Sequence, residues 1–244
     1  MLYTVRDECE RDLEATLRAV AALGYEGVEL FQLHGHEPGR VRGWLEELGL
    51  AGVGRHVSLD VLESDLDTLT REAEQLGLDR VALSWIEPPA TRNEGIAARE
   101  RIAAAAERVQ EHGLALGFHN HAGELAPLDG GGTFLDLLLE LPAELLWLEL
   151  DLGWVWEAGV DPVEALELAR GRSPLVHVKD FERRGSATFR PVGDGEIDYD
   201  RVLPAAERAG VEWLLVEQDE TDGPALAAVE RSLAAVRRVF GGPA

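Results

Sequence analysis

The sequence predicts an α/β fold in which a single (β/α)8 barrel (a TIM barrel) takes up the whole chain, residues 1–244. Short apolar runs alternate with amphipathic helical stretches from one end of the chain to the other. Turn residues bound these runs, as they bound the buried strands of a parallel sheet. The length also fits, because barrels of this kind use about 250 residues.

The first half of the chain contains four expected strand–helix units. The strands, of which the first is weak, cover residues 2–5, 27–31, 52–57 and 80–85. The helices that follow them cover approximately residues 10–23, 39–48, 62–76 and 97–112. The third helix has an apolar stripe at three- and four-residue spacing, which is typical of one buried helix face: Leu62, Leu66, Leu69, Ala73 and Leu76.

The second half repeats the pattern four more times. The expected strands cover residues 114–118, 146–150, 175–176 and 213–216. The helices that follow them cover approximately residues 133–140, 161–171, 199–210 and 224–240. No Gly-x-Gly-x-x-Gly stretch opens a helix after the first strand, which disfavours an open dinucleotide-binding sheet.

Several expected helices end at a glycine just before the next strand, where a left-handed C-terminal cap favours this residue. These glycines are Gly24, Gly49, Gly77, Gly113 and Gly210. The positions of these glycines therefore agree with the helix ends that the apolar pattern predicts. We expect no linker and no second domain.

Composition limits the classes of function. The formal net charge is −23, and a strongly acidic surface repels nucleic-acid phosphates and anionic membranes. No run of about 18 apolar residues suggests a membrane span, and the first residues lack the pattern of a signal peptide. We therefore expect a cytoplasmic protein with neither a nucleic-acid nor a membrane partner, and homo-oligomerisation stays open. Cys9 is the only cysteine, which excludes a cysteine cluster for metal.

Four polar side chains stand at or just past the ends of four successive expected strands. They are Glu124, Asp151, His177 and Glu217. In a parallel barrel these strand ends meet at one face, whose loops supply the chemistry. Singly, each acid could be a capping or solvated carboxylate, but the set of four indicates one divalent metal site. Oxygen-rich ligands without thiolate suit Mn²⁺ best, with Mg²⁺, Co²⁺ and Zn²⁺ as alternatives.

Such an ion could hold two adjacent oxygens of a hydroxy-ketone and polarise its carbonyl. Removal of the neighbouring C–H proton then becomes easier, because the enediolate charge develops against the metal. Glu124 and Glu217 could flank that carbon and serve as base and acid. Lys179 is the only lysine in the chain and shares a strand face with His177. We expect Lys179 to point into the barrel mouth and to donate a hydrogen bond to a substrate oxygen, as a third catalytic residue.

Other residues are expected to bind substrate around this centre. His119 and His121 share one face of the fifth strand, and Arg190 lies in a turn-rich loop after the seventh. Tryptophans in a barrel mouth can present their faces to the C–H groups of a sugar, although core packing explains each of them equally well. The expected substrate-binding residues are His56, Trp85, His119, His121, Trp154, Lys179 and Arg190.

Six stretches resemble the xylose-isomerase-like superfamily of sugar (phosphate) isomerases and epimerases. They are 24–30 (GYEGVEL), 118–124 (FHNHAGE), 150–154 (LDLGW), 177–180 (HVKD), 192–198 (VGDGEID) and 216–219 (VEQD). The resemblance implies a barrel, a divalent metal held by the four strand-end residues, and proton transfer by the two glutamates. Trp154 stands where ketose epimerases often have histidine, and Glu124 follows the fifth strand, so the pattern looks more like the inosose-dehydratase branch.

The sequence therefore predicts an enzyme that acts on a small sugar or polyol. The main hypothesis is a divalent-metal-dependent isomerase or epimerase of a sugar, keto-sugar or cyclitol, which acts through a metal-stabilised enediolate. The alternative is a metal-dependent dehydratase of a 2-keto-polyol such as an inosose. A metal-dependent nuclease is disfavoured by the acidic surface, and a non-catalytic sugar-binding barrel is disfavoured by the presence of both glutamates.

Overall fold

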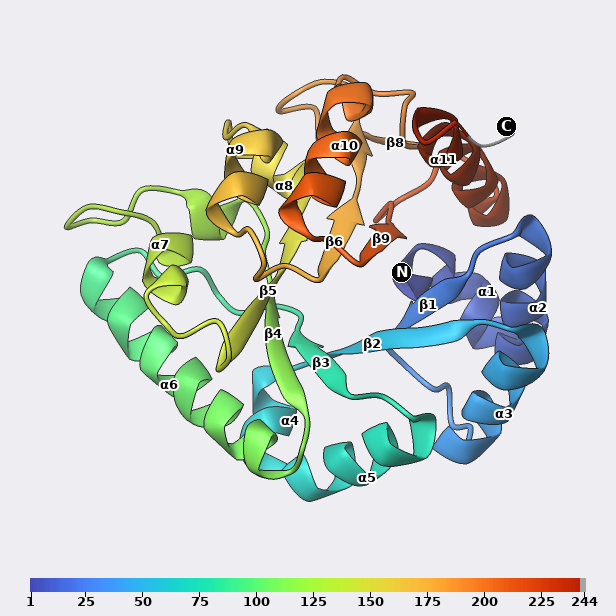
Figure 1. Cartoon of the computed structure of the whole chain (residues 1–244), viewed down its shortest axis with the longest axis horizontal. Coiled ribbons are helices and arrows are strands. Elements are labelled where there is room, and N and C mark those ends of the chain that lie inside the picture. The colour runs from blue at the N-terminus through green and yellow to red at the C-terminus, as the bar shows by residue number, and fades with distance from the viewer. Residues whose placement is uncertain (242–244) are drawn as a thin grey trace.

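A computed structural model describes residues 1–241 and has the predicted fold, a nearly closed barrel of parallel strands surrounded by helices (Figure 1). The seven strands of the barrel lie side by side in the order β1-β2-β3-β4-β5-β6-β9. Every neighbouring pair is parallel. Their bounds are β1 Gly27–Leu30, β2 Ala51–Val57, β3 Arg80–Leu83, β4 Ala115–His119, β5 Leu146–Asp151, β6 Leu175–Val178 and β9 Trp213–Val216.

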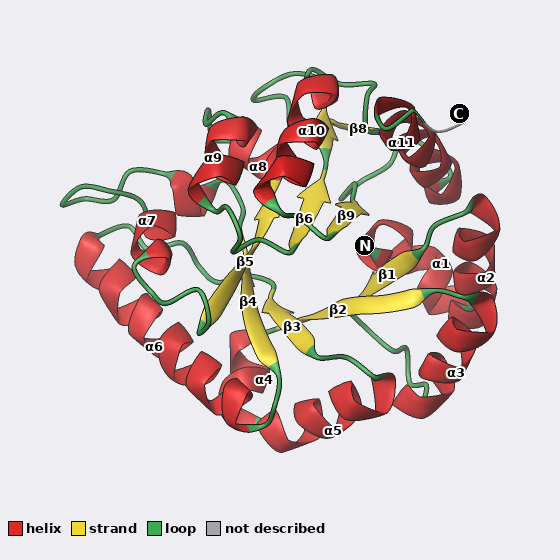
Figure 2. Cartoon of the chain, in the orientation of Figure 1, coloured by secondary structure: helices red, strands yellow, loops and turns green. Residues whose placement is uncertain are grey.

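The helices form the outer layer around the strands (Figure 2). They are α1 Arg6–Arg11, α2 Leu13–Leu23, α3 Pro38–Leu48, α4 Leu59–Ser64, α5 Leu66–Leu76, α6 Arg92–Glu111, α7 Phe134–Leu139, α8 Leu152–Glu157, α9 Pro162–Leu168, α10 Tyr199–Ala209 and α11 Ala225–Val239. Two short 3-10 helices, η1 Leu2–Val5 and η2 Gly123–Leu125, and a small antiparallel pair, β7 Asp180–Phe181 and β8 Phe189–Arg190, complete the described chain. No helix in residues 1–241 is long and apolar enough to cross a membrane.

The expected first strand is wrong, because residues 2–5 form the 3-10 helix η1. This 3-10 helix leads directly into α1, which begins at Arg6. Individual hydrogen bonds attach this segment to the end of β9: the Met1 amino group donates to the Val216 carbonyl at 2.8 Å, and the Gln218 N–H donates to Thr4 Oγ1 at 2.9 Å. The N-terminal segment thus lies where an eighth strand would close the ring (Figure 1).

Two expected helices are each divided in two by an aspartate. Asp12 has extended backbone angles between α1 and α2, and its side chain accepts a hydrogen bond from the Ala15 N–H at 2.9 Å. Asp65 separates α4 from α5 with non-helical backbone angles, although its side chain makes no capping hydrogen bond. Aspartate competes for backbone donors and favours caps over helix interiors, so a continuous apolar stripe did not reveal these breaks.

The predicted glycine caps are confirmed. Gly24, Gly49, Gly77, Gly113 and Gly210 have φ values of 98°, 67°, 74°, 78° and 88°. These values lie in the left-handed region that glycine enters without steric cost. Each turn returns the chain from an outer helix to the next strand.

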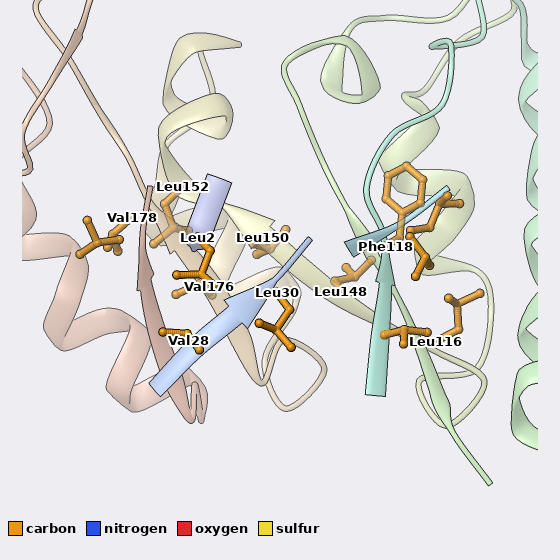
Figure 3. Packing of buried hydrophobic residues seen from close by; sticks show 14 of the residues in the cluster. Leu2, Val28, Leu30, Leu116, Phe118, Leu148, Leu150, Leu152, Val176 and Val178 are labelled. Carbon is orange, nitrogen blue, oxygen red and sulfur yellow. The ribbon is translucent and has the colours of Figure 1, made fainter. Parts of the chain in front are cut away.

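The alternation of side chains along each strand separates two environments. On β5, Leu148 and Leu150 face outward into the large apolar cluster between strands and helices (Figure 3). Trp147 faces the barrel interior and packs with Val53, Ala82, Leu175 and Leu215. Because the period of a strand is two residues, Glu149 and Asp151 follow Trp147 on the inward side. The barrel interior therefore changes from apolar to charged toward the carboxyl ends of the strands.

The apolar layer depends on Gly117, whose missing side chain makes room for the Trp147 ring. A Cβ atom on Gly117 would lie 2.4 Å from the Trp147 ring. We therefore expect Gly117→Ala to lower the free energy of unfolding by about 1–3 kcal/mol, the usual cost of overpacking a core. Urea unfolding monitored by circular dichroism measures this change.

Gly43→Ala provides the matched control. Gly43 lies within α3 and has no other atom within 4 Å of its ideal Cβ position. The added methyl group should therefore stabilise the protein by about 0.5–1 kcal/mol, because alanine favours a helix over glycine. A Gly117→Ala protein as stable as the wild type would show that Trp147 moves aside without cost.

Candidate metal centre

Four buried side chains converge at the carboxyl ends of the strands. His119 ends β4, Asp151 ends β5, His177 lies on β6 and Glu217 directly follows β9. One ligand atom from each of these residues lies within 4.8 Å of every other. We call these four residues the rim group. Three of them, Asp151, His177 and Glu217, are residues that the sequence marked as ligands.

Two further carboxylates lie one step deeper in the barrel. Glu149 precedes Asp151 by two residues on β5, and Glu29 lies on β1; neither side chain is exposed to solvent. Glu149 also forms a second close group with His56, His119 and His177. We call Glu29 and Glu149 the inner carboxylates. They face the imidazole rings rather than the cavity.

Lys179 supplies the buried positive charge of the rim. Its Nζ lies 3.0 Å from Asp151 Oδ2, 3.0 Å from Glu217 Oε2 and 2.9 Å from Asp219 Oδ1. Burial alone would lower the pKa of Lys179, but the three carboxylates outweigh it and raise the pKa above its ordinary value. The ammonium therefore stays charged and compensates the acidic rim. It also lies 5.0 Å above the Trp154 ring, a cation–π distance.

Glu217 is held in its ionised form. Burial would raise its pKa, but Lys179 and His177 bring the pKa well below the usual value of a glutamate. His177 Nδ1 lies 2.8 Å from Glu217 Oε2, and His177 Nε2 lies 2.8 Å from Glu29 Oε2. Burial would lower the pKa of His177, yet these carboxylates and Glu149 raise it well above its ordinary value. Glu217 is thus a carboxylate across the neutral pH range.

The remaining rim imidazoles are neutral. Burial lowers the pKa of His119 well below its ordinary value, with a smaller contribution from His177. Burial likewise lowers the pKa of His121 to about 4. Asp219 has a pKa raised to about 6, because burial outweighs the attraction of Lys179. Neutral imidazoles have a lone pair available for a metal ion or a substrate hydroxyl.

A cavity of about 430 Å³ opens onto this rim. Its inner wall includes His56, His119, His121, Lys179, Glu217 and Asp219. Its outer wall includes three aromatic side chains, Tyr3, Phe31 and Trp85, of which Trp85 is 52% exposed. Five residues expected to bind substrate therefore line one cavity: His56, Trp85, His119, His121 and Lys179.

Three predicted site residues belong neither to the rim group nor to this cavity wall. Glu124 sits in η2, where its Oε2 accepts a hydrogen bond from the His121 N–H at 2.8 Å, and it belongs to neither close group; its role as a ligand and base stays a prediction. Arg190 pairs with Asp222 and Glu182, at 2.7 Å each, beside a different cavity. Trp154 is partly buried behind Lys179.

The interpretation of the sequence missed Glu29, Glu149 and Asp219. A signal was present, because Glu29 and Glu149 are single charges inside otherwise apolar strands. Strand alternation also places Glu149 on the face of Asp151, and Asp219 on the face of Glu217. Buried charges of this kind require partners, and they mark functional sites more often than chance.

The donor set of the rim group fits a divalent cation. Two carboxylates and two imidazoles converge, and they suit Mn²⁺, Zn²⁺ and related ions. Asp151 uses Oδ1 to cap α8 through the Trp154 N–H at 2.9 Å, which fixes the orientation of the carboxylate. Its Oδ2 is buried and accepts no hydrogen bond within the described chain; its contact there is the Lys179 ion pair. A buried oxygen in this state is a ready ligand.

Comparison with known proteins assigns the chain to one family. A family model described as a xylose isomerase-like TIM barrel matches residues 17–239. The crystal structure of a sugar phosphate isomerase/epimerase from Parabacteroides distasonis has a TM-score of 0.82 at 19% identity, covering 98% of this chain and 93% of that chain. At this identity the likeness is one of fold.

Two curated relatives are similar in sequence. Inosose dehydratase from Geobacillus kaustophilus is 26% identical over 249 residues, covering 85% of this chain and 80% of the relative. The rhizopine catabolism protein MocC from Rhizobium meliloti is 30% identical over 132 residues. That second match covers 47% of this chain and only 40% of the relative's length.

The charge balance at the rim predicts the effect of removing Lys179. In Lys179→Met, the carboxylates of Asp151, Glu217 and Asp219 lose a shared buried cation. We expect the metal-free protein to lose about 3–5 kcal/mol of unfolding free energy, as when one partner of a buried ion pair is deleted. Saturating Mn²⁺ should restore part of this loss, because binding to the folded state stabilises it. Urea unfolding with and without Mn²⁺ measures both effects.

Arg201→Met is the control for loss of one positive charge. Arg201 pairs with Asp161 at 2.7 Å on the protein surface, where such pairs contribute about 0–1 kcal/mol. A loss of less than 1 kcal/mol in Lys179→Met would show that the three carboxylates need no buried cation.

Proposed function

The chain belongs to the xylose isomerase-like TIM barrel family, and we propose that it is a divalent-metal-dependent isomerase or epimerase of a sugar, keto-sugar or cyclitol. The observation that carries this proposal is the rim group, with ionised Glu217 at the wall of a cavity. Proton transfer next to a carbonyl needs these elements: a cation site, a carboxylate base and room for a small polyol.

The rim group, His119, Asp151, His177 and Glu217, would hold the cation. A divalent ion bound there would polarise the carbonyl of a hydroxy-ketone and acidify the adjacent C–H bond. Mn²⁺ is the ion that we propose, since the carboxylate and imidazole ligands suit it. The buried free oxygen of Asp151 and the neutral ring of His119 support this choice of ligands.

Glu217 is the proposed base. Its pKa lies well below the ordinary value because Lys179 and His177 stabilise the carboxylate, so at neutral pH the group has the ionised form that a base requires. Lys179 keeps Glu217 oriented through the 3.0 Å contact, and it lies in the cavity wall. To donate to a substrate oxygen, its ammonium would exchange one of its three carboxylate contacts for that oxygen. The second proton donor or acceptor predicted from the sequence is Glu124, which contacts the backbone of His121.

The cavity wall supports an uncharged polyol as the substrate. Trp85, Tyr3 and Phe31 provide aromatic surface on which the C–H faces of a sugar could pack. Among residues 1–241, no arginine lines this cavity, and the one lysine that does is already shared among three carboxylates. A phosphate group would find no free cationic side chain here.

Dehydration of a 2-keto-polyol is the second candidate. The similarity to inosose dehydratase over 85% of this chain favours it. The two reactions share the first proton abstraction by a carboxylate. They differ afterwards, because an isomerase returns a proton to carbon, whereas a dehydratase expels the β-hydroxyl group as water.

Incubation of a panel of ketoses and inososes with Mn²⁺ in D₂O tests the proposal. We expect deuterium to appear in NMR spectra at a carbon next to the carbonyl of the substrate. Product of unchanged composition supports isomerisation or epimerisation, and the loss of one water in the mass spectrum supports dehydration. A Mn²⁺-loaded protein that exchanges no proton in any member of the panel would contradict the proposal.

Glu217→Gln should keep the fold and lose proton exchange. The amide is of similar size but cannot accept the proton, so we expect exchange to fall by about 10²–10⁴-fold, the usual contribution of a general base. Glu212→Gln is the matched control, since Glu212 lies just before β9 and pairs with Arg80 at 3.2 Å, at the other end of the strand. Near-normal exchange in Glu217→Gln would exclude Glu217 as the base.

The Mn²⁺ affinities of two variants test whether His119 or Glu124 is the ligand from the region around β4. Loss of a residue that only hydrogen-bonds to a metal ligand typically weakens metal binding by about 10–100-fold. We expect His119→Ala, which removes a ligand itself, to weaken Mn²⁺ binding by more than this. Glu124→Gln should have a smaller effect, because Glu124 belongs to neither close group of ligand atoms. Isothermal titration of the metal-free proteins measures both constants. A large loss in Glu124→Gln and none in His119→Ala would instead place Glu124 among the ligands.

A further inference from the structure

We propose that Glu29 and Glu149, the inner carboxylates, are positioning residues that hold the imidazole rings of the rim with their ligand nitrogens turned toward the cation site. This inference rests on the proposed function, because it assumes that the rim group binds a divalent ion. It assigns a role to two buried acids that proton transfer itself does not use.

The contacts between the inner carboxylates and the rings are short and specific. Glu149 Oε2 lies 2.6 Å from His56 Nε2 and 3.2 Å from His119 Nδ1. Glu29 Oε2 lies 2.8 Å from His177 Nε2. Each of the three rings therefore has one nitrogen against an inner carboxylate. All three rings lie close together, with centroids 4.5–5.4 Å apart.

The opposite nitrogen of His177 faces the rim. His177 Nδ1 lies 2.8 Å from Glu217 Oε2, a member of the rim group. A ligand imidazole must offer the lone pair of one nitrogen, so its remaining proton has to be on the other. For a ligand bond through Nδ1, that proton is on Nε2, and Glu29 is the acceptor placed to hold it. His119 Nδ1 lies 3.2 Å from Glu149 Oε2 but makes no hydrogen bond within the described residues; a proton on Nδ1 would face Glu149 and leave Nε2 for the cation.

The surroundings leave the inner carboxylates few other partners. Beneath them lies the apolar layer of Val53, Trp147 and Leu175. Gly54 gives Glu29 its space, because a Cβ atom there would lie 3.3 Å from Glu29 Oε1. The Oε1 atoms of both inner carboxylates have no hydrogen-bond partner within the described residues. Such burial costs stability, so these acids are better explained by what they do to the rings.

A second cation between His56, His119, Glu149 and His177 is the competing explanation, since their ligand atoms also lie within 4.8 Å of one another. It would share His119 and His177 with the rim group. A neutral imidazole has a single free lone pair, so both groups could bind a cation together only if both shared rings lost their last proton. Hydrogen bonding to the inner carboxylates requires no such loss.

Substitution by methionine and by glutamine tests the proposal. Glu29→Met and Glu149→Met remove the acceptor while keeping similar bulk, and we expect each to weaken Mn²⁺ binding about 10–100-fold. Glu29→Gln and Glu149→Gln should recover part of the affinity, because the amide oxygen can still accept. Glu164→Gln, an exposed position on α9, is the control. Isothermal titration of metal-free protein measures all five variants.

The Mn²⁺ affinity of the folded variants separates positioning from a structural role. Deletion of one partner of a buried ion pair is destabilising, so Glu29→Met, which takes this carboxylate away from His177, should lower the melting temperature. Mn²⁺ affinity is therefore measured at a temperature at which each variant is folded, where a positioning role predicts weaker binding. A purely structural role would lower the melting temperature and leave the affinity of the folded protein unchanged. If a methionine variant fails to fold, the glutamine variants supply the affinity and melting data.

NMR of protein labelled with ¹⁵N in histidine gives a readout that needs no metal. We expect a slowly exchanging Nε2–H of His177 in the wild type and in Glu29→Gln, and its loss in Glu29→Met. Mn²⁺ affinities within twofold of wild type in both methionine variants would overturn the proposal. So would two metal ions per wild-type chain, with one lost in Glu149→Met, because Glu149 would then be a ligand itself.

The failure of the proposed function gives a different result. If no substrate in the D₂O panel exchanges but Mn²⁺ binds, the reaction class fails and the positioning role is still decided by the affinities. If the wild type binds no divalent ion, both proposals fail together, and the His177 Nε2–H signal then reports only a structural hydrogen bond.

Discussion

The rim of this barrel depends on the compensation of buried negative charge. Asp151, Glu217 and Asp219 share the Lys179 ammonium at 2.9–3.0 Å, and Glu217 and Glu29 share the His177 ring. Carboxylates without such partners could not remain ionised in this environment, because desolvation disfavours the charged form. The two cations thus keep Glu217 as a carboxylate and hold the strand ends together. This explains why the only lysine in a chain rich in arginine is almost fully buried: a compact ammonium reaches three acids that a planar guanidinium could not approach together.

Because side chains alternate along each strand, the apolar and charged groups inside the barrel are arranged in layers. Along β5 the inward side chains are Trp147, Glu149 and Asp151 in succession, while Leu148 and Leu150 face the helices (Figure 3). The apolar layer closes the barrel below, the inner carboxylates contact the rings, and the rim group opens to the cavity. Each layer orients the one above it: Trp147 fits only against Gly117, and the rings lie against Glu29 and Glu149. The same alternation that stabilises the barrel therefore prepares the candidate centre.

The layout favours chemistry that begins with removal of a proton next to a carbonyl. An ionised glutamate, neutral imidazoles and a permanently charged lysine surround a cavity with aromatic walls. Isomerisation and dehydration share this first step, and proteins similar to this chain in fold or sequence are named for both kinds of reaction. The fate of the intermediate depends on the placement of the second proton-transfer group relative to the substrate. His121 and Asp219 line the cavity, and Glu124 is the group predicted from the sequence.

The sequence by itself determined the order of the seven barrel strands, the five glycine caps, and the delivery of Asp151, His177, Lys179 and Glu217 to one end of the barrel. These features are local, because apolar periodicity and turn chemistry act over a few residues, and parallel strands must end on one face.

Only the tertiary structure decided that η1 takes the place of a strand, that Arg190 pairs with Asp222 and Glu182, and that His119 rather than Glu124 joins the rim group. It also revealed that Glu29 and Glu149 meet the rings. Such contacts join residues as far as 148 positions apart, and they depend on the stagger between strands, which pairs His119 with Glu149 and His177 with Asp151. No local pattern encodes that stagger, since it is set by the packing of the whole barrel.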